Sequence, residues 1–320
     1  MRLRFSAVLF ALTTIGCWVA LAGAANGQTC EGWSPVNPDS APSLNGVWAA
    51  SPSDVWAVGD SGAILHWDGG AWSSVPSGTT NILTAAWGSS ESDVWAAGFS
   101  GTLLHWDGNA WASAASPTTR ALNSIWGSGS NDVWAVGELA TILYFDGEVW
   151  SLVPSGLSML FEFWGVWGSA PDDVYAVGEF GVVLHWGGSS WSPTDAPTSG
   201  IIDLSSVWGS GPDDVYTVSN GEFGAIEHWD GATWTAMSLV DFEGDPHLGF
   251  NSIWGSGPND VWTAGYFGVL HWDGTSWTQV TCDPTELTGP INGIHGTGAK
   301  DIWAVTGIHF GGGAGAFHHP

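Results

Sequence analysis

The sequence predicts an all-β fold, a seven-bladed β-propeller whose blades are four-stranded antiparallel sheets. Three observations lead to this prediction. A motif of about 40 residues recurs along the chain, and turn signals divide each copy into four short apolar segments. The composition also fits, because 47 glycines and 25 tryptophans accompany only 11% charged residues. Such a chain suits short strands joined by tight turns better than helical bundles or disorder.

The repeat is anchored by a tryptophan followed six residues later by an aspartate, as in Trp48 and Asp54 of the first copy. The seventh copy has His295 at the tryptophan position. The register between the two anchor positions never slips, which indicates one structural unit repeated in tandem. We expect the blade cores at residues 44–75, 83–115, 122–153, 163–194, 204–237, 250–280 and 291–319.

The first copy shows how one blade is built. Its segments NGVWA, DVWAVG, AILHW and AWSSV are separated by turn sequences rich in serine, glycine and aspartate. Within DVWAVG the alternating side chains are apolar on both sides, with Val55 and Ala57 on one and Trp56 and Val58 on the other. A sheet that is apolar on both faces must be covered on both. Blades packed against their neighbours around a ring meet this requirement.

The two ends of the repeat array complement each other. The seventh copy stops before a fourth strand, whereas residues 32–36 (GWSPV) match the fourth-strand segment SWSPT of the fourth copy. We therefore expect the N-terminal strand to complete the last blade and close the ring, which removes an exposed sheet edge. Residues 25–320 then form a single propeller domain.

The first 24 residues have the pattern of a signal peptide. Arg2 and Arg4 precede an apolar run over 5–21, and small residues at 22–24 offer a cleavage site. We therefore expect a secreted, periplasmic or cell-surface protein. The remainder has only Arg120 and Lys300 as basic residues, while the chain contains 31 acidic ones. This charge disfavours nucleic acid and anionic membrane surfaces as partners. Cys30 and Cys282 can pair as a disulfide in an exported protein or stay free.

The string DVWAVGDSGAILHWDGGAW resembles the repeats of bacterial neuraminidase (Asp-box) propellers and of photosystem II assembly-factor-like propellers. These share a glycine turn, an apolar strand, a DGG turn and a following tryptophan. The string is also similar to tectonin repeats, which occur in glycan-binding propellers. The resemblance covers nearly the whole of residues 25–320. It implies a propeller and leaves the activity open, since enzymes, lectins and assembly factors share such repeats.

Residues that recur in every copy are expected to serve the scaffold, because a single site needs a residue once. We expect the tryptophans to fill the core between blades, and the histidines equivalent to His66 to pack with a hydrogen-bonded edge. The aspartates that open the second strands, and those of the hairpins, should cap backbone N–H groups of the turns. The hairpin set is Asp68, Asp107, Asp146, Asp230 and Asp273.

Candidate binding residues lie where the copies differ. The turns between second and third strands, and the linkers between blades, should open on one face of a propeller. This face would carry the aromatic and acidic residues Asp60, Phe99, Glu138, Glu179, Phe180, Glu222, Phe223, Tyr266 and Phe267. In the longest linker Asp241, Glu243 and Asp245 alternate like the start of a calcium loop, but no closing glutamate follows, so a solvated acidic loop is the alternative. We expect no other metal and no cofactor.

These features predict a non-catalytic, monomeric binding protein. Aromatic rings stack on sugars and carboxylates accept their hydroxyl groups, so a glycan is the preferred ligand, and docking of a cell-surface or other protein is the alternative. Arg120 is the only arginine outside the leader, which disfavours a sialidase with its arginine cluster. A neutral-sugar glycoside hydrolase stays open as a third class, although no catalytic carboxylate pair stands out.

Overall fold

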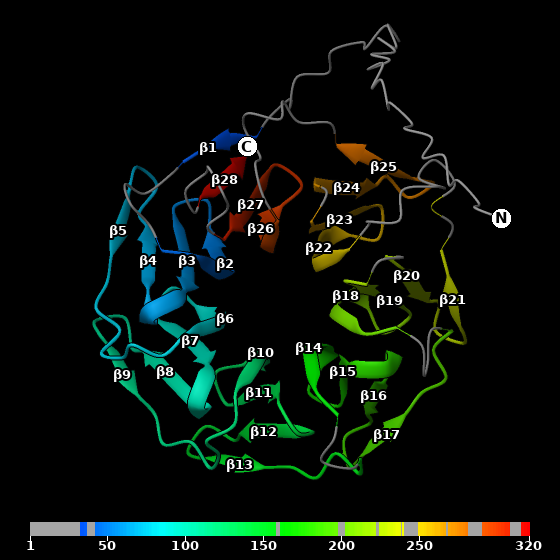
Figure 1. The fold of residues 1–320 in the computed structure, drawn as a ribbon, viewed down its shortest axis with the longest axis horizontal. Coiled ribbons are helices and arrows are strands. Elements are labelled where there is room, and N and C mark those ends of the chain that lie inside the picture. The colour runs from blue at the N-terminus through cyan, green and yellow to red at the C-terminus, as the bar shows by residue number, and fades with distance from the viewer. Residues whose placement is uncertain are drawn as a thin grey trace, which may run out of the picture.

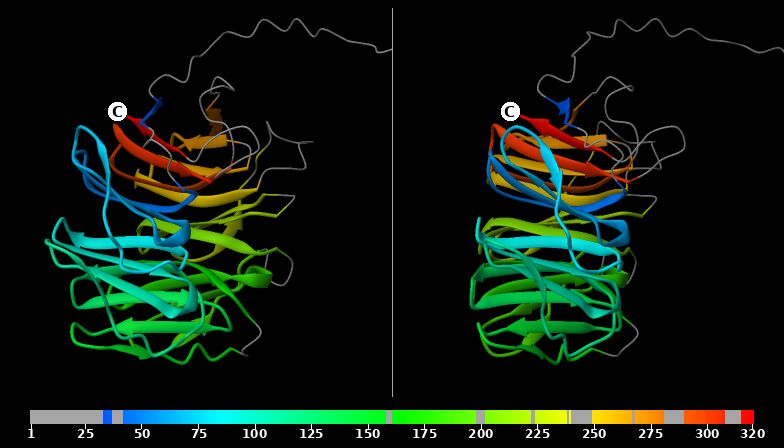
Figure 2. Two further views of the ribbon diagram at one scale, coloured as in Figure 1. Left: turned by 60° about the vertical axis from the view of Figure 1, so that its left-hand side comes forward. Right: turned by 90° about the vertical axis from the view of Figure 1, so that its left-hand side faces the viewer.

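Seven four-stranded antiparallel sheets stand around a common axis and form a seven-bladed β-propeller (Figure 1). In each sheet the strands follow one another outward in chain order, apart from the last blade. Seen from the side, the strands run between the two faces of the ring (Figure 2). The structure is a computed structural model, and it describes residues 33–36, 42–157, 161–197, 202–221, 224–237, 239, 249–266, 268–280, 290–307 and 315–320.

The strands occupy equivalent positions in all blades. The first strands are β2 (Leu44–Ser51), β6 (Leu83–Ser90), β10 (Leu122–Gly129), β14 (Phe163–Ala170), β18 (Leu204–Gly211), β22 (Phe250–Gly257) and β26 (Ile291–Gly298). The second strands are β3 (Asp54–Gly59), β7 (Asp93–Gly98), β11 (Asp132–Gly137), β15 (Asp173–Gly178), β19 (Asp214–Ser219), β23 (Asp260–Gly265) and β27 (Asp301–Thr306). The third strands are β4 (Ile64–Trp67), β8 (Thr102–Trp106), β12 (Thr141–Phe145), β16 (Val183–Trp186), β20 (Ile226–Trp229), β24 (Gly268–Trp272) and β28 (Ala316–His319).

The fourth strands are the outermost and the shortest. They are β5 (Trp72–Ser74), β9 (Trp111–Ser113), β13 (Trp150–Leu152), β17 (Trp191–Pro193), β21 (Trp234–Ala236), β25 (Trp277–Val280) and, in the last blade, β1 (Ser34–Pro35). Three short 3₁₀ turns lead from second to third strands, namely η1 (Asp60–Gly62), η2 (Phe99–Gly101) and η3 (Glu179–Gly181). Within the described ranges no helix is long and apolar enough to cross a membrane.

The N-terminal strand closes the ring, as the sequence predicts. β1 pairs antiparallel with β28, with Ser34 opposite His318, and the seventh sheet has the order β1-β28-β27-β26. Val36 N donates to Ala316 O at 2.9 Å and continues this pairing. The edge of β28 is therefore covered by a strand from the other end of the chain.

The hydrophobic core lies between blades. One cluster joins Trp56, Val58 and Ile64 of the first blade to Leu83 and Val94 of the second, and similar clusters follow around the ring. This arrangement confirms that both faces of each sheet are covered. It also confirms the structural role of the repeated tryptophans, since Trp56 and its equivalents are buried.

The repeated histidines and aspartates form pairs within each blade. His66 stacks on Trp56 with ring centroids 4.3 Å apart, and its Nε2 lies 3.2 Å from Asp54 Oδ1. The same pair recurs in five further blades, while Tyr144 replaces the histidine in the third blade and packs on Trp134. The packing role predicted for the histidines is thus confirmed.

The two sets of aspartates differ in what they bind. In the hairpins, Asp68 Oδ1 accepts hydrogen bonds from Gly70 N and Ala71 N, both at 2.9 Å, so the predicted capping is confirmed there. The prediction is wrong for Asp54 and its equivalents, because their carboxylates bind side chains of histidine and of serine or threonine. Strand pairing brings Asp54 and His66 together from positions 12 residues apart.

A buried polar pair interrupts the core of the fifth blade. Glu227 in β20 takes the position that leucine fills in five other blades, and it pairs across the sheet with Thr217 of β19. Both residues are fully buried, and Thr217 Oγ1 donates to Glu227 Oε2 at 3.1 Å.

Removing one partner of this pair should cost more stability than removing both. Thr217→Ala withdraws a hydrogen bond from a buried carboxyl group and should lower the free energy of unfolding by about 1–3 kcal/mol. Adding Glu227→Leu creates the alanine–leucine pair that four other blades have at this position, and it should recover that loss. Denaturant unfolding of the single and double variants measures both effects. A double variant less stable than Thr217→Ala would contradict this account.

Candidate binding site on the loop face

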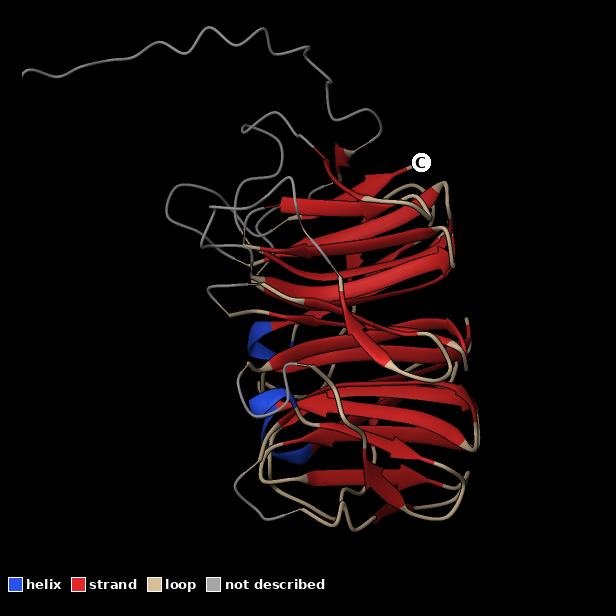
Figure 3. Ribbon diagram, turned by 90° about the vertical axis from the view of Figure 1, so that its right-hand side faces the viewer, coloured by secondary structure: helices blue, strands red, loops and turns tan. Residues whose placement is uncertain are grey.

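One face of the ring carries both kinds of variable connection. We call it the loop face, and it is formed by the turns from second to third strands and by the linkers from fourth strands to the next blade. The two kinds of connection meet at a surface pocket. This pocket is lined by Asp60–Gly62 of η1 and by residues 76–80 of a linker. The three 3₁₀ turns lie on this same side (Figure 3). This agrees with the geometry expected from the sequence.

An axial cavity of about 670 Å³ opens among the inner strands at the loop face. The second residue of every first strand lines it, so all seven blades contribute one side chain at the same height. These residues are Asn45, Thr84, Asn123, Trp164, Ser205, Asn251 and Asn292.

Six of these seven side chains tie neighbouring blades together. Asn45 Nδ2 donates to Leu83 O of the next blade at 3.0 Å, and Asn292 Nδ2 donates to Leu44 O across the closure at 2.8 Å. Thr84, Asn123, Ser205 and Asn251 make the same bond to their next blades at 2.6–2.9 Å. A short polar side chain at this position therefore serves the scaffold.

Trp164 is the exception in this set. It is 39% exposed, lines the cavity, and its indole donates no hydrogen bond to any described residue. A tryptophan at this position makes no inter-blade hydrogen bond and exposes an aromatic ring to solvent. Neither change stabilises the folded ring, so the stability of the scaffold does not explain this residue. Sequence reasoning missed Trp164 among 25 tryptophans. A comparison of this one position across the seven copies could have identified it, because the other six copies have asparagine, serine or threonine there.

Other exposed apolar side chains gather on the same face. Phe99 (43% exposed) and Tyr266 (55%) line the axial cavity with Trp164. Phe180 is 53% exposed and packs edge-to-face against Phe161. Leu139, in the turn after β11, is also exposed. Among the described large apolar side chains, the other exposed ones are Val149 and Leu152, at the outer edge of the third blade.

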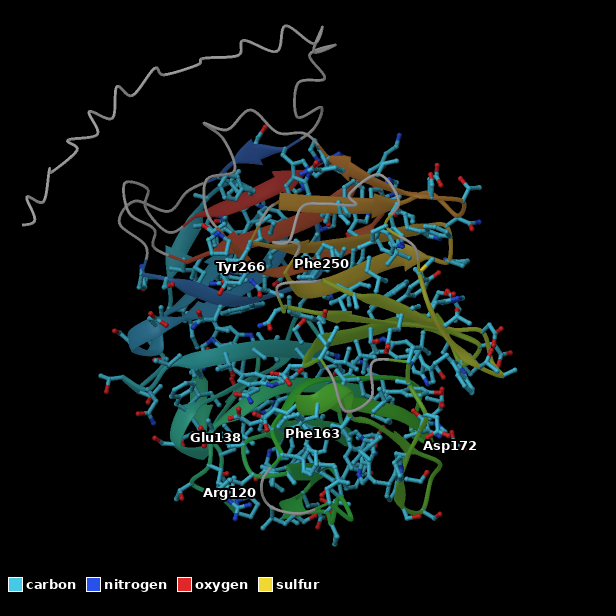
Figure 4. All side chains as sticks on the ribbon, turned by 45° about the vertical axis from the view of Figure 1, so that its right-hand side comes forward. Arg120, Glu138, Phe163, Asp172, Phe250 and Tyr266 are labelled. Carbon is cyan, nitrogen blue, oxygen red and sulfur yellow. The ribbon has the colours of Figure 1, made fainter. Side chains whose placement is uncertain are left out.

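Three carboxylates also line the cavity, namely Glu138, Glu162 and Asp203. Glu138 Oε2 accepts a hydrogen bond from Ala121 N at 3.0 Å, and Asp203 Oδ1 accepts one from Phe180 N at 2.8 Å. These bonds fix the two carboxylates at the rim. Figure 4 shows Glu138 and Tyr266 on separate parts of the ring, with Phe163, the residue before Trp164, near Glu138.

Glu162 sits in a strongly negative environment. Burial raises the pKa of its carboxyl group above the ordinary value, and the neighbouring carboxylates of Glu179, Glu138 and Asp203 raise it further. Glu179 Oε2 also accepts a hydrogen bond from Glu162 N at 3.0 Å. The acidic groups of three consecutive blades thus converge beside Trp164.

The structure brings together part of the predicted set. Phe99, Glu138 and Tyr266 line the axial cavity, and Glu179 and Phe180 lie beside it in η3. Asp60 instead lines the pocket at η1, where its Oδ1 accepts a hydrogen bond from Asn45 Nδ2 at 3.0 Å.

Several predicted residues lie outside the described part of the chain. They are the binding candidates Glu222, Phe223 and Phe267, the calcium candidates Asp241, Glu243 and Asp245, and the cysteines Cys30 and Cys282. Over the ranges that the structure describes, no group of three or more histidine, cysteine or acidic side chains is arranged to hold a metal ion.

Comparisons with known proteins show the fold. No family model matches the chain, and no curated protein matches it either. It is similar to the solved structure of YCF48 bound to D1 peptide, with 17% identity, a TM-score of 0.67, and coverage of 90% of this chain and 94% of that one. YCF48 from Cyanidioschyzon merolae gives 17% identity and 0.68, covering 90% and 99%. The WD40 propeller domain of Doa1 gives 15% and 0.71, covering 90% and 97%.

Proposed function

We propose that this chain is a non-catalytic binding propeller that docks an extended segment of a partner protein on its loop face, centred on the axial cavity. The observation that carries the proposal is Trp164, an exposed aromatic side chain at a position where the other six blades have a small polar residue tied to the scaffold. Aromatic side chains dominate the energetics of protein interfaces.

The surroundings of Trp164 support a protein ligand. Phe99 and Tyr266 share its cavity, and Leu139 and Phe180 add exposed apolar surface on the same face. Apolar patches ringed by polar groups are typical of docking sites. YCF48, which has the same fold, has been solved with a D1 peptide, so this architecture accommodates a peptide ligand.

A glycan is the second candidate for the same cavity. Phe99 and Tyr266 offer rings for stacking, and the rim combines amide groups of five asparagines with carboxylates that accept sugar hydroxyl groups. The peptide is preferred because Phe180 and Leu139 extend the apolar surface beyond the cavity, which suits a longer ligand.

Selection from a displayed library of random peptides tests the proposal. Panning on the wild-type chain should enrich peptides that bind at least tenfold more weakly to Trp164→Asn, since a buried aromatic anchor contributes about 1.4 kcal/mol or more. Asparagine is the residue found at this position in four other blades, so the variant should fold. The control, Val149→Ser, removes exposed apolar surface from the hairpin between β12 and β13, on the face opposite the loop face, and should leave binding unchanged.

A glycan array on the same proteins separates the two candidates. Selective glycan binding that is lost in Tyr266→Ala, together with no Trp164-dependent peptides, would replace the protein ligand with a glycan. Peptides that bind the wild-type chain and Trp164→Asn equally well would refute the proposed site.

A further inference from the structure

The axial cavity is polarised across the ring. Its acidic side comes from three consecutive blades, which supply Glu138, Glu162 and Asp203, and Trp164 lies on this side. The remaining blades contribute mainly amide groups, such as those of Asn251 and Asn292. None of the described residues that line the cavity is basic. The cavity therefore places three negative charges around one exposed indole.

The scaffold accounts for only part of this arrangement. The carboxylates of Glu138 and Asp203 each accept a hydrogen bond from a backbone N–H group. The carboxylate of Glu162 accepts no hydrogen bond from the described residues. Its neighbours are acidic, and they raise its pKa together with burial. Gathering like charges beside a partly buried carboxylate opposes its ionisation. A positive ligand group would remove this repulsion.

The aromatic ring restricts the kind of cation. The face of an indole attracts organic cations, and arginine more often than lysine. A guanidinium group is planar, so it stacks on an aromatic ring while its N–H groups bind carboxylates in a fork. In the part of the chain that the structure describes, no three acidic, histidine or cysteine side chains are arranged to hold a metal ion, and this includes the three carboxylates of the cavity.

We infer that the axial cavity holds an arginine side chain of the bound peptide, stacked on Trp164 and paired with Glu162, Glu138 and Asp203. This inference rests on the proposed function and adds the chemistry of the ligand to it. The peptide backbone then lies over the loop face, where Phe99, Phe180 and Tyr266 contact its flanking apolar residues.

Three short peptides of one design test this inference. They are acetylated and amidated pentapeptides of glycine with arginine, lysine or citrulline at the centre, titrated into the full chain while the indole N–H signals are followed by NMR. Citrulline has nearly the shape of arginine without its charge. The arginine peptide should bind about tenfold more tightly than the citrulline peptide, and the lysine peptide should fall between them.

Matched variants separate a specific site from general attraction to an acidic protein. Glu162→Gln and Trp164→Asn should each weaken the arginine peptide by about tenfold. Asp172→Asn removes a carboxylate from the turn between β14 and β15, on the face opposite the loop face (Figure 4), and should leave affinity unchanged.

The outcomes separate this inference from the proposed function. Equal affinity for arginine and citrulline, absence of binding at millimolar peptide, or an equal loss in Asp172→Asn would overturn the arginine site. If the peptides selected by panning depend on Trp164 but lack basic residues, the arginine site is also wrong, while the proposed docking function stands. Absence of any Trp164-dependent peptide would refute the proposed function itself.

Discussion

Truncating Trp33 to alanine should lower the melting temperature by roughly 10 °C, which corresponds to a loss of about 3–5 kcal/mol in the free energy of unfolding. Trp33 is 3% exposed and belongs to the core cluster of the last two blades. Its ring lies 6.3 Å from that of Trp262 and 5.4 Å from that of His319. The loss is expected because the cavity left by an indole cannot collapse inside a ring of packed sheets.

Deleting residues 31–37 should have a larger effect than any single core truncation. The deletion removes the Trp33 ring, the pairing of β1 with β28, and the cover of an otherwise open sheet edge. An exposed edge promotes association between chains, so we also expect oligomers in size-exclusion chromatography. Trp111→Ala is the matched control, because it removes the equivalent fourth-strand tryptophan from the second blade, which is formed by one continuous stretch of chain. A deletion variant that melts like the wild type would contradict closure by this strand.

Acidification should destabilise the ring through one residue at its closure. His295 is partly buried, its Nδ1 accepts a hydrogen bond from Ala49 N at 3.2 Å, and burial lowers its pKa to about 4. The unfolded chain has the ordinary value of 6.5. Between these values the unfolded state binds more protons, so the free energy of unfolding falls as the pH falls from about 6.5 to about 4. The total loss attributable to His295 should be about 3 kcal/mol.

The residues around His295 suggest a matched variant. In other blades a tryptophan packs its ring edge on a glycine of the next blade, as Trp48 does at Gly88, where an added Cβ would lie 2.7 Å from the ring. At the closure, His295 replaces that tryptophan and Ala49 replaces the glycine. The smaller imidazole ring leaves room for the alanine methyl group.

The double variant His295→Trp with Ala49→Gly should therefore fold, while His295→Trp alone should be destabilised by a clash with the Ala49 methyl group. Denaturant unfolding of the wild type and the double variant at pH 7 and pH 4.5 isolates the contribution of His295 from that of the many carboxylates. The double variant should lose less stability on acidification. The same loss in both proteins would show that His295 does not titrate as its burial implies.

The fold could be predicted from the sequence because every structural signal is repeated. Turn sequences, alternating apolar strands and the Trp48 to Asp54 spacing recur in each copy, and the unmatched strand at 32–36 indicated the closure. The partners of Asp54 could not be predicted in the same way. They depend on the pairing of β3 with β4, which places His66 opposite Trp56 and within reach of the carboxylate.

The residues of the candidate site could be predicted in part. The rule that copies differ at the site led to Phe99, Glu138 and Tyr266, which do line the axial cavity. The same rule did not reveal that the carboxylates of Glu138 and Glu179 also accept hydrogen bonds from backbone N–H groups. The rule did not lead to Trp164, because it was applied to the turns and linkers and Trp164 lies in a first strand. It also did not lead to Glu162 and Asp203, which lie in the linkers. Their convergence is a property of the closed ring, in which neighbouring blades bring their linkers together around one axis.

The central claim is that the axial cavity on the loop face is the binding site. Hydroxyl-radical footprinting of the chain, with and without the tightest peptide selected by panning, tests it most directly. The account predicts that Trp164, Phe99 and Tyr266 lose reactivity in the complex, while the exposed side chain of Val149, in the hairpin between β12 and β13 on the opposite face, keeps its reactivity. Protection confined to the outer edge or to the opposite face, with Trp164 unchanged, would contradict it.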